Sequence, residues 1–162
     1  MKILKSVRRS FWVALLGSTA LYAASPLTLT VVQGHSMEPT LRPGSVSLLD
    51  RGYYRFHALS RGDIVVLRLR GETLIKRVYA LPGERLDLLR FDDNAGNELL
   101  TPAEAAHLRR LQVAGYLTDA HVLSVTVPPD HCFVLGDNSP VSVDSRDFGA
   151  VSMSAILGRA FG

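Results

Sequence analysis

Short runs of apolar and β-branched residues, separated by Gly, Pro, Asp and Asn, follow one another after Pro26. Runs of this length and composition are typical of β-strands rather than of helices. Turn signals lie between them at Gly71-Glu72, which predicts a tight hairpin, at Pro82-Gly83 and at residues 92–96. We therefore expect strands over residues 27–32, 45–50, 63–70, 73–80, 85–90, 121–127 and 131–135.

One segment has the pattern of a helix instead. Thr101 suits the N-cap, Pro102 suits the first helical position, and Glu104 completes a capping box. The helix should run to about Val113, with Gly115 ending it, and we interpret it as a surface insertion. Together these patterns predict a mostly β fold, in which a barrel-like antiparallel β-sheet domain carries one helical insertion.

The first 32 residues have a different pattern. Four basic side chains lie within residues 1–10, and residues 11–32 carry no charge. A retained membrane anchor has this composition, and so does a cleaved signal peptide with small residues at the cut, here Ala23-Ala24-Ser25. Pro26 disfavours a helix at Ser25, so a spanning helix would begin before Phe11 or be short. Both alternatives keep the basic residues cytoplasmic and export the rest of the chain.

Charge and cysteine content exclude several classes of protein. The tail holds four of the 18 basic side chains, which leaves 14 basic against 15 acidic side chains in the body. The body has no basic run interleaved with aromatics, so we expect no nucleic-acid partner. The single cysteine, Cys132, cannot form an intrachain disulfide and lies in an apolar run, which predicts a packed thiol. No Cys/His spacing is typical of zinc, so we expect no metal and no cofactor.

Lys76 is the only lysine beyond residue 10, and the other 13 basic side chains in that part of the chain are arginines. Strand alternation puts Leu74, Lys76 and Val78 on one face. Desolvation by such neighbours lowers the pKa of an amine, which a general base requires, whereas arginine stays protonated. A lysine that extends its charge into water at a sheet edge would show the same pattern.

Two further segments have the composition of a site. Residues 34–41 place Ser36 on a turn after an apolar strand, where its hydroxyl can be exposed and Gly34 permits a close approach to the backbone. Residues 136–149 form a polar loop after a buried strand, in which Ser142 could orient an amine and Asp144 could pair with Arg146. Taken singly, each segment is also compatible with an ordinary surface loop.

Taken together, these segments resemble type I signal peptidases, the membrane-bound serine-lysine proteases that remove signal peptides from exported proteins. The resemblance covers residues 36–41, 61–66, 75–78 with 81–84, and 136–149, in that order and with an apolar segment upstream. It implies that Ser36 is the nucleophile and Lys76 the general base. It also implies that the first apolar segment is a retained anchor.

The resemblance assigns further roles by position. Ser142 corresponds to the hydroxyl that orients the lysine, Asp144 and Arg146 to a structural pair, and Asp137 to a carboxylate that stabilises the loop. The Ser36 N–H would donate to the oxyanion, and the second donor stays open because Gly34 stands where some members have a serine. Val143 is expected to tighten the apolar wall beside Lys76. The residues that match positions near shallow substrate pockets are Met37, Leu41 and Ile75.

The resemblance also implies a location and partners. Residues 1–26 would be a cytoplasmic basic tail and transmembrane anchor, and residues 27–162 an extracytoplasmic catalytic domain on a single span of the cytoplasmic (inner) membrane. The expected partners are the lipid bilayer and the signal peptides of exported preproteins, cut after Ala-x-Ala-like sites. A translocon contact is compatible with this placement, but no residue indicates one.

Three alternatives compete with this interpretation. A Ser-His-Asp hydrolase would use one of the five histidines, but His35 adjoins Ser36, and neighbours on an extended chain point to opposite faces. An exported binding or assembly module would not need both Ser36 and Lys76. Self-cleaving repressors share a Ser-Lys fold, but they carry a DNA-binding domain where this chain has an apolar segment.

Overall fold

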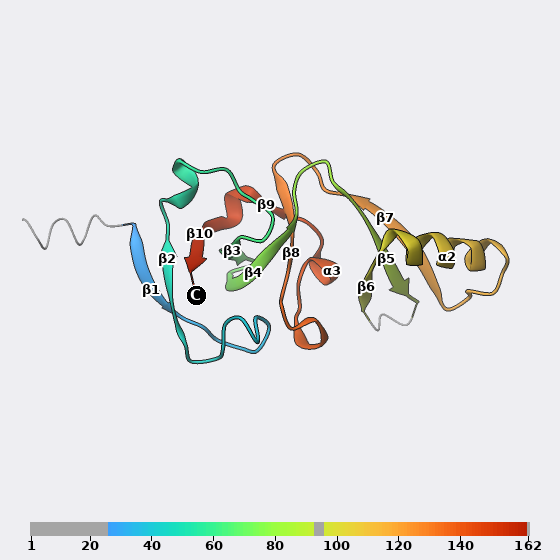
Figure 1. Ribbon diagram of the computed structural model, residues 1–162, viewed down its shortest axis with the longest axis horizontal. Helices are drawn as coiled ribbons and strands as arrows, with labels where there is room; N and C mark the ends of the chain where they lie inside the picture. Colours follow the sequence, from blue (N-terminus) through green and yellow to red (C-terminus); the bar gives the residue numbers. More distant parts are fainter. Residues whose placement is uncertain (1–25, 93–95, 162) are drawn as a thin grey trace, which may run out of the picture.

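The computed structural model describes residues 26–92 and 96–161, which form ten strands in two antiparallel sheets (Figure 1). The large sheet has the order β1 (Leu27–Val31), β2 (Val46–Asp50), β10 (Ile156–Phe161), β3 (Ile64–Leu69), β4 (Glu72–Ala80), β8 (His131–Leu135), β9 (Val151–Ser152). The small sheet has the order β6 (Asn97–Leu100), β5 (Arg85–Phe91), β7 (Ala120–Thr126). Figure 1 shows the two sheets side by side along the long axis, with β1 at one end and α2 at the other.

The predicted strands are confirmed, and the predicted hairpin is correct except for its turn residues. Strands β3 and β4 pair in the expected register, with Val65 opposite Lys76 and Leu69 opposite Glu72. The two turn residues are therefore Arg70 and Gly71, not Gly71 and Glu72. Both have positive φ, 51° and 89°, as a two-residue hairpin of the type that matches strand twist requires.

The predicted helix is confirmed as α2 (Pro102–Val113). Thr101 and Glu104 form the capping box reciprocally, and Gly115 follows the helix with φ 80°. The insertion is larger than the helix alone, because β6 pairs with β5 just before it and β7 pairs with β5 just after it. Other short helices are α3 (Ser145–Phe148), η1 (Tyr53–Arg55), η2 (Ser139–Val141) and η3 (Met153–Ala155).

The expected barrel is wrong for the described residues, because neither sheet closes on itself. Closure requires the two edge strands to pair. In the large sheet, β1 pairs with β2 and β9 pairs with β8, so these two strands remain separate edges. Strand β10 instead joins the interior of the sheet, where the backbone at Gly158 approaches Asp50 so closely that a Cβ would lie 2.3 Å from the Asp50 carbonyl oxygen.

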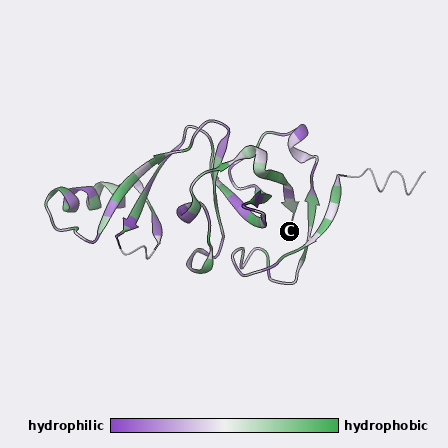
Figure 2. Cartoon of the chain, turned by 180° about the vertical axis from the view of Figure 1, so that it is seen from behind, coloured by the Kyte–Doolittle hydropathy of each residue, from purple (hydrophilic) through white to green (hydrophobic). Residues whose placement is uncertain are grey.

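The interior of the large sheet is apolar on the side that includes Val65, Val78 and Val134. Figure 2 shows hydrophobic and hydrophilic residues alternating along the strands, as half-buried sheets require. Cys132 is fully buried, which confirms the packed thiol, and burial raises the pKa of this thiol to about 11. No helix of the described chain is long and apolar enough to cross a bilayer. The predicted anchor falls almost entirely on residues 1–25, outside the described part.

Candidate active site

Ser36 lies in the loop between β1 and β2. The residues before and after Ser36 hold this loop in one conformation. Gly34 has φ 76°, a left-handed conformation that favours glycine, and Met37 accepts a backbone hydrogen bond from Leu41 at 2.9 Å. Met37 and Leu41 are buried with Val32 beneath this loop. The Ser36 side chain is thus presented on a short, internally bonded turn whose underside is packed.

Lys76 lies on β4 with only 3% of its surface exposed, and its Nζ donates to Ser142 Oγ at 3.1 Å. Burial lowers the pKa of Lys76 below its ordinary value of 10.5, the Asp144 carboxylate opposes this shift, and the Arg146 guanidinium adds to it. Desolvation therefore exceeds the attraction to a nearby carboxylate, as the alternation of β4 predicted.

Ser36 and Lys76 line one cavity of about 260 Å³. Its walls are the end of β1 with residues 32 and 33, the Ser36 turn, and residues 73–76 of β4. Of the predicted pocket residues, Met37 and Ile75 line this cavity, whereas Leu41 packs beneath it and Gly34 forms part of the turn. Two segments 40 positions apart in the sequence thus supply a hydroxyl and a largely desolvated amine to one site.

The polar loop after β8 places the predicted Asp144–Arg146 pair behind Lys76. Asp144 is fully buried and accepts from Arg146 Nε at 2.9 Å and from the Gly136 N–H at 3.0 Å. Burial opposes ionisation of Asp144, but these hydrogen bonds outweigh it and lower its pKa. Asp144 therefore ties the start of the loop, Gly136, to its end, with Ser142 between them.

Asp137 accepts two hydrogen bonds from Arg77, the residue after Lys76. Arg77 Nε donates to Oδ1 at 2.8 Å and Nη2 donates to Oδ2 at 2.6 Å. Arg77 also donates to Thr40 Oγ1 at 3.4 Å. Burial of Asp137 opposes ionisation, but the hydrogen bonds from Arg77 and Thr40 lower its pKa. The pair thereby joins the Ser36 turn, β4 and the loop after β8.

Asn138 and Gly136, for which the sequence predicted no role, lie directly against the Ser36 turn. The Asn138 N–H donates to the Ser36 carbonyl at 2.9 Å, and Asn138 Nδ2 donates to the His35 carbonyl at 3.1 Å. The His35 carbonyl and the Ser36 N–H belong to one planar peptide and point in opposite directions. Asn138 therefore fixes the direction of the Ser36 N–H. At Gly136, an added Cβ would lie 2.2 Å from Ser142 Oγ, so only glycine fits.

Comparison with known proteins identifies the family of this chain. Residues 4–162 match the family described as "Signal peptidase, peptidase S26". The chain belongs to this family. A signal peptidase I of Bacillus caldolyticus is 36% identical over 135 residues, which cover 80% of this chain and 74% of that protein. A signal peptidase IB of Staphylococcus aureus (strain COL) is 29% identical over 143 residues, 82% of this chain and 75% of that protein. A crystal structure of a signal peptidase I from Enterococcus faecalis V583 is 30% identical, covers 64% of this chain and 97% of that chain, and gives a TM-score of 0.39.

One residue of this signal peptidase family member differs from its expected placement. Val143 is 67% exposed and points away from the interior, so it does not tighten the wall beside Lys76. Alternation explains this, because its neighbours Ser142 and Asp144 are both buried.

Four of the five histidines form hydrogen bonds with groups other than Ser36 and Lys76. The Nδ1 atoms of His35, His57, His121 and His131 bond to Glu38, Tyr53 O, Asp92 and Pro129 O respectively. Among the described residues, no group of three His, Cys, Asp or Glu side chains could hold a metal ion.

Proposed function

We propose that this signal peptidase family member is a membrane-bound endopeptidase that removes signal peptides from exported preproteins, with Ser36 as nucleophile and Lys76 as general base. One observation carries the proposal: a buried amine with a lowered pKa, bonded to Ser142, lines the same cavity as the Ser36 hydroxyl. A group that must exchange protons with a serine needs both this access and a neutral form at working pH.

The first half of the reaction forms an acyl-enzyme. Ser36 Oγ attacks the carbonyl carbon of the scissile peptide while its proton moves to Lys76 Nζ. The oxyanion accepts a hydrogen bond from the Ser36 N–H, whose direction Asn138 fixes. The C–N bond then breaks, the Lys76 ammonium protonates the leaving amine, and the mature protein departs. The signal peptide remains as an ester on Ser36.

The second half releases the signal peptide. A water molecule gives one proton to Lys76 Nζ and attacks the ester carbonyl, and the proton returns to Ser36 Oγ as the ester bond breaks. Lys76 is thus a base and an acid in turn, because its neutral amine gains one proton and gives it up again in each half of the reaction. Ser142 supports this exchange because its contact with Nζ restricts a side chain that otherwise has many rotamers.

The shape of the cavity supports a preference for small side chains before the cut. An extended peptide between the end of β1 and residues 73–76 of β4 would run alongside two strand segments, a recognition mode in which alternate side chains enter pockets. Met37 and Ile75 would limit the depth of these pockets. We therefore propose Ala-x-Ala-like sites as the substrates.

An exposed apolar face on β1 and β2 favours a position of the active site beside a bilayer. Strand alternation and the antiparallel register, with Leu29 opposite Leu48 and Val31 opposite Val46, put these side chains on one face, and all four are exposed. Phe161 on the neighbouring β10 is exposed as well. A patch of this kind is typical of membrane or protein contacts. It lies directly after the predicted anchor, so we propose that the catalytic domain rests on the outer surface of the membrane.

A cleavage assay tests the proposal. The full-length chain in detergent is mixed with a preprotein that carries an Ala-x-Ala site, and the new N-terminus is sequenced. We expect one cut after the second alanine with the wild type and none with Ser36→Ala, whose unfolding temperature should stay unchanged. Cleavage by Ser36→Ala at the wild-type rate, or a cut elsewhere, would refute the proposal.

A further inference from the structure

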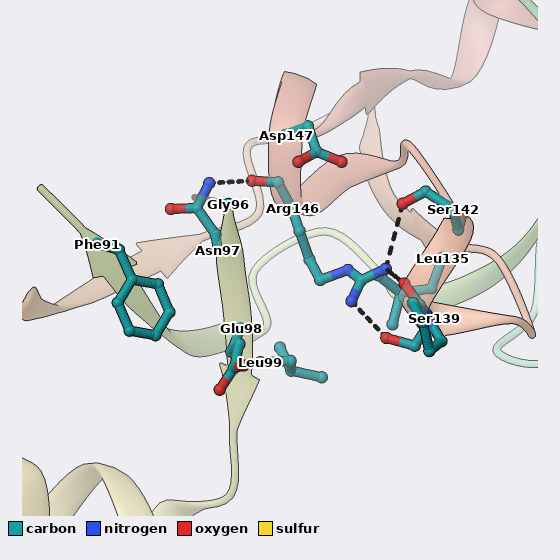
Figure 3. Close-up of a pocket in the computed structure, with 11 residues that line it drawn as sticks. Phe91, Gly96, Asn97, Glu98, Leu99, Leu135, Ser139, Ser142, Arg146 and Asp147 are labelled. Carbon is teal, nitrogen blue, oxygen red and sulfur yellow. Dashed lines mark hydrogen bonds between the residues drawn. The ribbon is translucent and has the colours of Figure 1, made fainter. Parts of the chain in front are cut away.

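A cavity of about 630 Å³ separates the small sheet from the loop that carries Ser142 (Figure 3). Phe91 and residues 96–99 line one side of it, and Ser139, Ser142 and Arg146 line the other. A hydrogen bond spans the two sides, from Asn97 Nδ2 on β6 to the backbone carbonyl of Arg146 on α3, at 2.5 Å. It connects the insertion, to which the sequence assigned no role, with the loop behind Lys76.

Asn97 is oriented for this contact by its own sheet. Arg90 lies directly opposite it on β5, and Arg90 Nε donates to Asn97 Oδ1 at 3.3 Å. Because a guanidinium only donates, the carbonyl end of the Asn97 amide faces Arg90 and the NH₂ end faces Arg146. The last four carbonyls of a helix have no partner within it, and α3 is only four residues long, so Asn97 satisfies a carbonyl that the helix itself cannot.

Contacts continue from Arg146 to Lys76. The Arg146 side chain donates to both carboxylate oxygens of Asp144, at 2.9 and 2.8 Å, and to the Ser139 carbonyl at 3.0 Å. Arg146 Nη2 also lies 3.4 Å from the Ser142 carbonyl. These contacts fix the backbone on both sides of Ser142, whose hydroxyl accepts from Lys76 Nζ. A movement of Arg146 would therefore reach the amine through Ser142.

We infer that the insertion positions the active site, and that Asn97 is a positioning residue that acts on Lys76 through Arg146 and Ser142. This inference rests on the proposed function of Lys76 and Ser142. The loop needs a restraint on its outer side, because that side borders the open cavity rather than packed side chains. The hydrogen bond from Asn97 restrains the loop on that side.

Two substitutions at Asn97 and one control test the inference in the full-length protein. Asn97→Ala removes the donor, and Asn97→Asp keeps the shape but places a carboxylate against the Arg146 carbonyl. The control is Arg109→Ala, which breaks the 2.5 Å contact with Asp87 inside the insertion and touches no part of the loop. Loss of one hydrogen bond predicts a fall in kcat of about three- to tenfold for Asn97→Ala, with KM unchanged. Asn97→Asp should be at least as impaired, and Arg109→Ala should keep the wild-type kcat.

A double-mutant cycle with Ser142→Ala separates positioning from general destabilisation. If Asn97 acts through Ser142, Asn97→Ala should cause no further loss of kcat once the Ser142 hydroxyl is absent. Full additivity of the two losses would overturn the inference, and so would an unchanged kcat in Asn97→Ala.

Amide hydrogen exchange gives a readout that needs no catalysis. Residues 139–148 should exchange faster in Asn97→Ala than in the wild type and in Arg109→Ala. If the wild type cleaves no preprotein but exchange in this segment accelerates, the proposed function fails while the restraint of the loop by Asn97 stands. Unchanged exchange would contradict that restraint whatever the activity.

Discussion

Gly136→Ala should separate the residues of the active site without unfolding the protein. A Cβ at this position would lie 2.2 Å from Ser142 Oγ, 2.5 Å from the Ser36 carbonyl oxygen and 2.6 Å from Ser142 Cβ. Ordinary contact distances are about 3.5 Å, so Ser36 and Ser142 must each move away from the new methyl group by roughly 1 Å. A displacement of that size in a catalytic group lowers turnover on the order of 10²-fold. Insertion of a methyl group into a filled space should also destabilise the fold by about 1–3 kcal/mol.

The assay is kcat per folded molecule, measured together with the unfolding temperature. Gly158→Ala is a matched control, because its Cβ would lie 2.3 Å from the Asp50 carbonyl, in the large sheet and away from the cavity that Ser36 lines. Both variants should unfold at lower temperature, but only Gly136→Ala should lose turnover. The reasoning is wrong if folded Gly136→Ala keeps a kcat within about twofold of the wild type, since a 1 Å displacement should lower it far more.

Three further predictions follow from the site and its surroundings. Asn138→Ala should lower kcat about tenfold at constant KM, because the Ser36 N–H loses its fixed direction, and a kcat within about twofold of the wild type would argue against this. Preproteins with Phe in place of either alanine of the Ala-x-Ala site should not be cleaved, whereas equal cleavage of Phe and Ala substrates in a competition assay would contradict a pocket limited by Met37 and Ile75. Protease added outside intact spheroplasts should digest residues 33–162, and protection of that part would reverse the proposed topology.

The strands and the helix could be predicted because their signals are local. The capping box at Thr101 and Glu104 and the alternation along β4 each depend on a few neighbouring residues, and both are confirmed. Strand β10 could not be predicted, because Gly158 and Arg159 interrupt its apolar pattern and its place depends on pairing with β2 and β3, about 100 positions away in the chain. The expected barrel was wrong for a related reason, since closure depends on which edge strands meet.

The site shows the same division between local and distant information. The burial of Lys76 could be predicted from its neighbours on β4, and the pairing of Asp144 with Arg146 from their spacing. Asn138 and Asn97 could not be found in this way, because each acts by donating to a backbone carbonyl of a distant segment, at His35 and Arg146. Backbone carbonyls are present at every residue, so the sequence carries no signal for such a partner.

The titration of Lys76 tests the central claim most directly, and the chain is suited to it. Lys2 and Lys5 are the only other lysines, so ¹³C-labelled lysine gives three signals. The signal that disappears in Lys76→Arg belongs to Lys76. Burial should make Lys76 titrate below 10.5. Because only the neutral amine accepts the Ser36 proton, kcat/KM should rise with pH through that same pKa and then level off. Lys76→Arg should lose on the order of 10³-fold in activity. A Lys76 signal that titrates at or above 10.5, or a rising limb that persists in an active Lys76→Arg enzyme, would contradict the account.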